Sequence, residues 1–451
     1  MSSRIILSCV LLLIAQPAIP AVDNGLGVAP FLYTAAKTYD PLAWLHGAER
    51  FPSGSAVFIS NETGRRLLAP DFAASADPEI SFDGHKVLLA AKARREDPWQ
   101  IWEVDLAGGA AKQITSFPED CIKPFYLPDD RVVYARKIGG RFVVEAKELG
   151  SNKTLVLTYF PSNSVPTDVL RDGRILFESA FPPGTGDNPE IYTVYSDGSG
   201  VESYRCDHGA GRHSARQQAS GDVVFTTASG LARFTSARVQ QVKIISPAGE
   251  YAGDFAEVIP NEWLLAWRPN RSAPYRLMRW VPGDRELKLL AADAAANLVE
   301  PILIAPHAIP NRHPSGLHDW PNANLLCLNA YTSKHLLTPG SIHSIHSVRA
   351  YTRDESGHPK LLGTAPVERD GSFFVQVPSE QPLQFELLDA AGKSLHREAG
   401  YFWMRRGEQR VCVGCHAGPE TAPENAVPQI LLKSTTPADL TGTSAVSAGG
   451  H

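Results

Sequence analysis

After its first 21 residues the sequence lacks any apolar run of the roughly 20 residues that a membrane-spanning helix needs. Neither sign of charge dominates, since 43 Lys and Arg residues stand against 48 Asp and Glu residues, and the basic residues form no cluster. The sequence therefore predicts no transmembrane anchor, no nucleic-acid partner and no binding to an anionic membrane surface.

Several common enzyme motifs are absent as well. The sequence has no GxxxxGK[ST] phosphate loop, no HExxH zinc motif and no GxSxG nucleophile elbow. These absences argue against a serine hydrolase of the prolyl-oligopeptidase type. What is present is 451 residues of 43% hydrophobic content, which is enough for two or three domains with their own cores.

The first 21 residues have the pattern of a secretory signal peptide. One basic residue, Arg4, precedes an apolar run, and small residues lead up to Ala21. We expect cleavage near Ala21 and a mature protein that is periplasmic or secreted. Removal of Cys9 would leave five cysteines, so at least one serves something other than a disulfide. Cys121 and Cys206 are either a disulfide pair or two core thiols.

Strand-and-turn units recur through residues 40–305. The clearest unit spans residues 78–115 and contains the tight turn Asp83-Gly84. Equivalent turns follow one another at intervals of 40 to 48 residues, at Gly84, Asp130, Gly173, Gly221 and Asn261. A period of about 40–50 residues made of strands is typical of a β-propeller with four-stranded blades. The sequence therefore predicts six blades, with seven as the alternative.

The first interval, from Gly54 to Gly84, is only 30 residues. This short interval is expected if one blade is completed by a late strand such as Pro301-Ile302-Leu303-Ile304 pairing with an early segment. The repeats also resemble the blades of the TolB-like propeller family, whose blades begin with a Ser-x-Asp-Gly type of turn. That resemblance implies architecture only, because propellers host many functions.

A second all-β unit is predicted over residues 322–406. Runs with strand character are separated by Asp370-Gly371 and Ala391-Gly392, without helical periods, which favours a small β-sandwich. Residues 306–321 are interrupted by prolines and are predicted to be a linker. Residues 407–432 form a further segment that contains the chemistry, and residues 433–451 are predicted to be a flexible tail.

The segment Cys412-Val413-Gly414-Cys415-His416 is a c-type haem attachment motif. Its two thiols bond to the haem vinyl groups, and His416 is placed to ligate the iron. The composition predicts only about 0.0025 occurrences of this motif by chance. The alternatives are a local disulfide, a redox dithiol or half of a zinc site, but no βαβ context or further zinc ligands lie nearby. We therefore expect one covalent haem c.

Only 35 residues follow His416, too few for a helical cytochrome domain. The predicted haem must therefore be housed by the β-sandwich and the rim of the propeller. Candidates for further metal ligation are Cys327, Met404 and His313, each of which has a simpler interpretation as a packed or ordinary side chain. His318, His343 and His346 lie in the same stretch as His313. If none of them binds the iron, its sixth position is open to small molecules.

The C-terminal third resembles a known family. The residues that carry the resemblance are Leu326-Cys327-Leu328-Asn329, 367–373, 387–392, 407–416 and Ala422-Pro423-Glu424-Asn425. They are similar to bacterial proteins related to the alpha subunit of hydrazine synthase. The resemblance implies a propeller joined to a β-rich middle domain with a c-type haem. It also implies that the motif histidine need not ligate iron and that a zinc ion can lie near the haem. The alpha subunit of hydrazine synthase is similar to a protein with two haems, whereas this sequence contains one CxxCH motif.

Three functions remain open at this point. The first is an exported monohaem c-type protein in electron transfer, or a redox subunit with an unidentified partner protein. The second is an interaction module whose haem is structural. The third is a haem oxidoreductase that acts on a small nitrogen or oxygen species.

Overall fold

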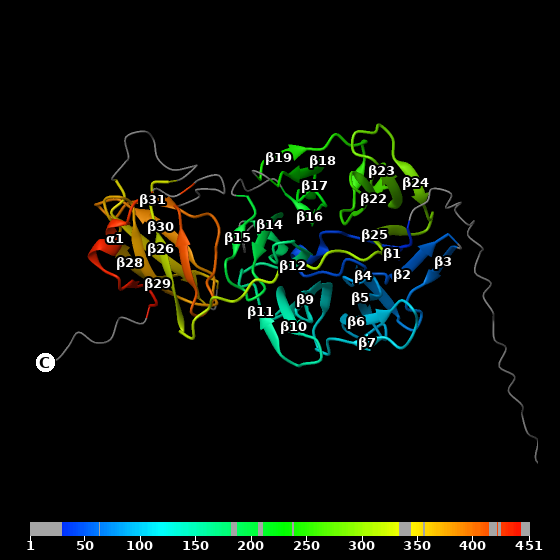
Figure 1. Ribbon diagram of the computed structural model, residues 1–451, viewed down its shortest axis with the longest axis horizontal. Coiled ribbons are helices and arrows are strands. Elements are labelled where there is room, and N and C mark those ends of the chain that lie inside the picture. Colours follow the sequence, from blue (N-terminus) through cyan, green and yellow to red (C-terminus); the bar gives the residue numbers. More distant parts are fainter. Residues whose placement is uncertain are drawn as a thin grey trace, which may run out of the picture.

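The computed structural model describes residues 29–62, 64–181, 187–205, 211–236, 239–332, 344–354, 357–414, 422 and 425–442. These residues form two bodies built almost entirely of β-strands (Figure 1). The predicted signal peptide, Cys206, Cys415 and His416 lie outside the described residues. Within the described part of the chain, no helix is long and apolar enough to cross a membrane.

The larger body is a propeller of six antiparallel sheets. From the inner edge outward, the first blade consists of β25 (Asn297–Leu303), β1 (Phe31–Ala36), β2 (Ala56–Asn61) and β3 (Gly64–Leu67). The second blade consists of β4 (Ala74–Ile80), β5 (Lys86–Lys92), β6 (Gln100–Asp105) and β7 (Lys112–Gln113). The third blade consists of β8 (Cys121–Leu127), β9 (Arg131–Ile138), β10 (Arg141–Glu148) and β11 (Thr154–Val156). The fourth blade consists of β12 (Ser164–Val169), β13 (Ile175–Phe181), β14 (Asn188–Val194) and β15 (Glu202–Ser203). The fifth blade consists of β16 (His213–Gln217), β17 (Val223–Thr227), β18 (Gly230–Phe234) and β19 (Gln241–Lys243). The sixth blade consists of β20 (Glu250–Tyr251) with β21 (Ala256–Ile259), β22 (Glu262–Arg268), β23 (Arg276–Trp280) and β24 (Lys288–Ala291).

The ring closes through the first blade. The late strand β25 pairs antiparallel with β1, with Phe31 opposite Leu303, so the two ends of the propeller share one sheet. The repeat turns at 84, 130, 173, 221 and 261 all join the first and second strands of a blade, whereas Gly54 joins β1 and β2, the second and third strands. This difference explains the short first interval. The pairing of β1 with β25 places the start of the propeller at Phe31, ahead of the expected residue 40.

The smaller body is a sandwich of two four-stranded sheets. One sheet contains β32 (Gln409–Cys412), β26 (Asn322–Cys327), β29 (Phe373–Pro378) and β33 (Ala438–Asp439), and the other contains β28 (Pro359–Pro366), β27 (Ser347–Arg353), β30 (Gln384–Leu388) and β31 (Ser394–Arg397). Their facing sides enclose one apolar core that includes Leu325, Phe373 and Leu387. Two short helices, η1 (Ala43–His46) and α1 (Gln429–Lys433), complete the described elements.

Two strands of the sandwich come from segments predicted to lie apart from it. The motif strand β32 pairs parallel with β26, so the start of the 407–432 segment is part of the sandwich sheet. The strand β33, within the predicted tail, pairs parallel with β29, and Leu440 beside it is 1% exposed. Burial of this apolar side chain holds residues 438–440 in place, so the expectation of a flexible tail is wrong there.

The linker runs without regular secondary structure along the propeller. Its backbone is fixed where the His307 N–H donates to the Phe82 carbonyl at 2.9 Å and the Asn311 N–H donates to the Arg171 carbonyl at 2.8 Å. At Gly173, which has a φ of 89°, a Cβ would lie 2.2 Å from the Asn311 carbonyl oxygen. Only glycine allows this approach of the linker to the turn between β12 and β13.

The two bodies are joined by a segment of the sandwich that inserts into the propeller. Trp403 is completely buried and packs edge-on against Phe160, with ring centroids 4.7 Å apart. Its indole Nε1 donates to the Gly198 carbonyl at 3.0 Å. Beside it, Arg405 donates to the Val156 carbonyl at 3.4 Å. These contacts set the position of the sandwich against the third and fourth blades.

Candidate functional site

A cavity of about 230 Å³ lies between the propeller and the sandwich. Most of its walls are apolar or aromatic, and they come from both bodies: Phe160 and Val201 from the propeller, and Leu325, Phe373, Phe385 and Phe402 from the sandwich. Because these side chains converge from segments far apart in the sequence, the cavity depends on the docking of the two bodies.

The first cysteine of the motif lines this cavity. Cys412 ends β32 and lies directly opposite Cys327, which ends the neighbouring parallel strand β26. Both residues are on the cavity wall, Cys412 half-buried and Cys327 1% exposed. The parallel register therefore brings the first cysteine of the CxxCH motif next to Cys327, one of the three further metal ligands predicted from the sequence.

The chain after Cys412 leaves the sheet through a tight passage. At Gly414 a Cβ would lie 2.3 Å from the Thr332 carbonyl oxygen and 2.7 Å from that of Asn329. A side chain at this position would collide with backbone, which cannot easily yield. The glycine between the two motif cysteines is therefore required by the path of the chain along the cavity.

The other residues predicted as ligands lie elsewhere. Met404 is fully buried in the sandwich core and is not a lining residue of the cavity. His313 stacks on Tyr195 of the propeller with ring centroids 3.7 Å apart. Cys415 and His416 lie outside the described residues. The structure thus brings Cys327 to Cys412 but does not bring Met404 or His313 into the cavity.

The cavity wall also contains a carboxylate that was not predicted from the sequence. Glu398 follows β31 and is partly exposed, and desolvation at the cavity wall raises the pKa of its carboxyl to about 7. The sequence around it, Arg397-Glu398-Ala399-Gly400, carries no signal for such a role. Its significance arises only from the folding of this segment over the cavity.

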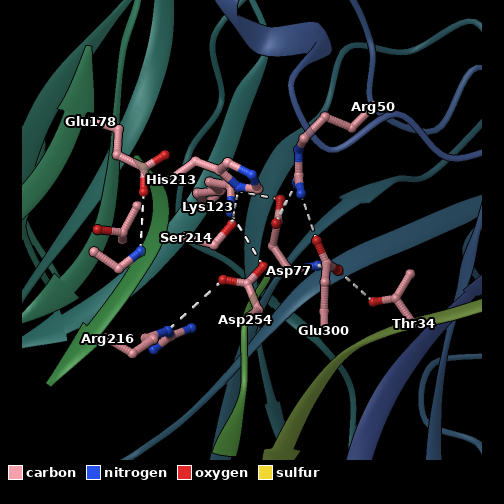
Figure 2. Close-up of polar contacts among 12 residues, drawn as sticks. Thr34, Arg50, Asp77, Lys123, Glu178, His213, Ser214, Arg216, Asp254 and Glu300 are labelled. Atoms are coloured by element: carbon pink, nitrogen blue, oxygen red, sulfur yellow. Dashed lines mark hydrogen bonds and ion pairs between the residues drawn. The ribbon is translucent and has the colours of Figure 1, made fainter. Parts of the chain in front are cut away.

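A second cluster, also missed, fills the axis of the propeller, and Figure 2 shows its polar contacts. Arg50 forms ion pairs with Glu300 (2.6 Å) and Asp77, and all three residues are buried. Lys123 approaches Asp254 at 3.6 Å, and Arg216 lies 3.9 Å from the same carboxylate. The cluster links the inner strands of several blades through buried opposite charges.

Backbone geometry aims these side chains inward. In five of the six blades one residue at the inner edge has a positive φ: Asp77 (55°), Lys123 (51°), Ser214 (56°), Asp254 (41°) and Glu300 (55°). Irregular register in β4, β8, β16 and β25 accompanies them. Strain of this kind persists only where the surroundings over-determine it. The sequence signal was a charged residue before proline in mid-strand, as in Asp77-Pro78, Lys123-Pro124 and Glu300-Pro301.

Comparison with known proteins identifies relatives of the region around the cavity. The family model for the hydrazine synthase alpha subunit middle domain matches residues 331–417. The hydrazine synthase subunit alpha of Kuenenia stuttgartiensis is 32% identical over 156 residues, which are 32% of this chain and 17% of that subunit. The chain is related to the alpha subunit of hydrazine synthase.

The solved structures extend this comparison to the whole architecture. Kuenenia stuttgartiensis hydrazine synthase overlays with a TM-score of 0.76 at 17% identity, covering 90% of this chain and 72% of that one. TolB from Acinetobacter baumannii overlays with a TM-score of 0.47 at 15% identity, covering 61% of this chain and 66% of that one. The overlay on hydrazine synthase shows a common fold of propeller and middle domain.

The segment matched to the hydrazine synthase alpha middle domain contains Glu398, Met404 and the whole motif from Cys412 to His416. It does not extend to the axial cluster of the propeller. Because the sequence match spans a small part of hydrazine synthase subunit alpha, the activity and partners of that whole protein are not carried over to this chain by the match.

The lining of the cavity is chemically compatible with a covalently attached porphyrin. Its apolar aromatic walls suit a flat, largely apolar group, and Cys412 stands on the wall where a thioether would form. A metal ion alone is less well provided for: within the described ranges, no group of three or more His, Cys, Asp or Glu side chains is arranged to hold one. A zinc site that uses Cys327 would need ligands from outside those ranges.

Proposed function

We propose that this chain is an exported monohaem c-type protein that acts in electron transfer or as a redox subunit. The haem would be bonded through Cys412 and Cys415 and housed in the cavity between propeller and sandwich, with His416 as the axial ligand. The observation that carries the proposal is the position of Cys412 on the wall of an apolar interdomain cavity. When bound there, haem supplies one-electron redox chemistry.

The chain's own residues have clear tasks in this proposal. Cys412 and Cys415 anchor the group, and the segment around Trp403 fixes the two cavity walls relative to each other. The aromatic side chains of the wall present apolar surface to a group held in the cavity. The redox partner is an exported protein that exchanges single electrons.

The experiment is maturation of the full chain with a haem-attachment system, followed by a pyridine haemochrome spectrum. We expect one haem per chain, with loss of covalent haem in Cys412→Ala and Cys415→Ala. Cys121→Ala is the matched control, because Cys121 is a buried free thiol in the propeller core whose pKa burial raises to about 12. A haem-free wild-type chain, or equal haem in all variants, contradicts the proposal.

A second candidate function is a haem oxidoreductase for a small nitrogen or oxygen species. The observation in its favour is that neither Met404 nor His313 lines the cavity, so neither is placed to bind a group held there. A high-spin spectrum together with CO or NO binding supports this function. A low-spin six-coordinate spectrum supports electron transfer, and a haem without redox activity in a chain that binds a partner tightly supports the interaction module.

A further inference from the structure

The backbone around the cavity holds Glu398 in a defined place. Its N–H donates to the Phe385 carbonyl at 3.0 Å, and the Gln384 side chain donates to the Glu398 carbonyl at 2.6 Å. The Glu398 side chain then turns back, so that Oε2 accepts the Phe385 N–H at 3.5 Å. Its carboxyl group is therefore held against β30 at the cavity wall by the Phe385 N–H.

The surroundings of this carboxyl group are apolar. Phe373, Phe385 and Phe402 line the same cavity, and burial is the largest influence on the Glu398 carboxyl, raising its pKa to about 7. Only the Phe385 N–H acts in the opposite direction, and no charged side chain offsets the burial. A carboxyl group without a compensating cation changes its protonation readily when charge is added nearby.

Most other charged and titratable groups around the cavity form ion pairs or hydrogen bonds with residues other than Glu398. Glu202 pairs with Arg174 at 2.7 Å, and Arg410 pairs with Glu408 at 2.6 Å. The Tyr401 hydroxyl accepts a hydrogen bond from Arg353 at 3.1 Å. On the strands next to Glu398, Arg397 donates to Gln384 at 2.9 Å and Glu386 lies 3.3 Å from Arg349. The remaining titratable groups on the wall are Tyr192, Cys327 and Cys412.

We propose that Glu398 is the proton-exchanging residue of this cavity: it takes up one proton from solvent when the cavity's redox group accepts one electron, and it releases that proton when the electron leaves. The electron comes from a one-electron donor protein, and the proton forms a single O–H bond on the carboxylate. The inference rests on the proposed function, because it requires a redox group at Cys412. Its physical basis is that an added electron in a poorly solvated cavity favours the neutral form of a neighbouring carboxyl group.

The test is the midpoint potential of the haem-loaded full chain measured between about pH 5 and pH 9. Around neutral pH we expect the equilibrium constant for reduction of the haem to change tenfold per pH unit. For a one-electron couple this corresponds to a change of about 59 mV per pH unit in the midpoint potential. Glu398→Gln is expected to abolish this dependence while retaining the same haem content. Glu202→Gln is the control, because this exposed carboxylate lies at the same cavity but is paired with Arg174.

A haem-loaded wild-type chain whose potential does not depend on pH overturns the inference, as does a Glu398→Gln variant with the wild-type slope. If that variant fails to fold, Glu398→Asp keeps a titrating group and is expected to keep the slope. A second readout needs no haem: in the Cys412→Ala chain, infrared spectra should show the Glu398 carboxyl titrating near neutral pH. An ordinary carboxyl pKa there overturns the inference, whereas absence of haem from the wild-type chain refutes the proposed function instead.

Discussion

Cys412 and Cys327 are register partners on the parallel strands β32 and β26, and both stand on the wall of the interdomain cavity. This pairing places the motif strand inside the sandwich sheet rather than on a separate segment. It means that the sheet itself positions the first anchoring thiol of the proposed haem. The two cysteines can be distinguished by experiment because only Cys412 belongs to the attachment motif.

Cys327→Ala is expected to leave the yield of covalent haem unchanged, because the thioether bonds use Cys412 and Cys415. Loss of the buried side chain should lower the free energy of unfolding by about 1 kcal/mol, a typical cost of a core substitution. Haem yield and urea denaturation measure the two effects. Haem loss as complete as in Cys412→Ala contradicts this division of roles.

Gly414→Ala is expected to lower the yield of covalent haem. Its Cβ would lie 2.3 Å from the Thr332 carbonyl oxygen, so the motif loop must shift at a cost of about 1–3 kcal/mol. Gly316→Ala is the matched control, because a Cβ there meets nothing within 4 Å. The pyridine haemochrome yield compares the two variants, and equal yields would show that the tight passage at 414 is unimportant.

Trp403→Ala is expected to cost about 3–5 kcal/mol and to loosen the docking of the two bodies. The indole is completely buried against Phe160 and donates to the Gly198 carbonyl. Trp320→Ala in the linker serves as the control, since Trp320 is 48% exposed. Chemical denaturation and the rate of proteolysis within residues 306–321 report the difference. A Trp403 variant as stable and protease-resistant as the control argues against a fixed junction.

Arg50→Met is expected to destabilise the propeller by about 3–5 kcal/mol, because Asp77 and Glu300 would remain buried without their cation. The control is Lys92→Met, which removes the more exposed pair with Glu49 and should cost about 1 kcal/mol or less. Thermal unfolding of both variants measures the effect. Similar small losses in both would mean that the axial ion pairs contribute little to ring closure.

Glu178→Gln is expected to remove part of the pH dependence of folding stability. Burial raises the pKa of the Glu178 carboxyl from 4.5 to about 8, so the folded protein binds this proton more tightly than the unfolded chain does. The resulting stabilisation is complete below about pH 4.5 and is lost as the pH rises through about 8, an effect on the order of a few kcal/mol. The stability of Glu178→Gln relative to wild type should therefore increase from pH 5 to pH 8.

Urea denaturation at the two pH values measures this change, with the exposed Glu286→Gln as the control. A constant difference between Glu178→Gln and wild type at both values would show that Glu178 does not hold its proton in the folded state.

The sequence predicted those parts of the fold that depend on local patterns. Turn residues such as Gly84 and Gly173 recur with the blade period, and the short first interval predicted the shared blade closed by β25. The strand β1 was missed at the start because it is completed only by a partner more than 260 residues away. The parallel strand β33 was missed for a different reason, since its two residues carry no periodicity of their own.

For the candidate site, the attachment motif was visible because its chemistry lies in five consecutive residues. The cavity wall was not, since side chains such as Phe160 and Phe373 line one cavity only after the two bodies dock. Glu398 and the axial residues such as Asp77 gain their roles from burial and backbone geometry. In the sequence, a charged residue before proline within a strand indicates a turn or an edge strand. Its position at the axis of the propeller follows only from the closed ring of blades.

The central claim is that two thioether bonds hold one haem in the interdomain cavity, and intact-mass spectrometry of the matured full chain tests it most directly. The account predicts the mass of one haem on the wild-type chain and on Cys121→Ala, and no added haem on the double variant Cys412→Ala, Cys415→Ala. A wild-type chain that carries no added mass after maturation with an active haem-attachment system contradicts it.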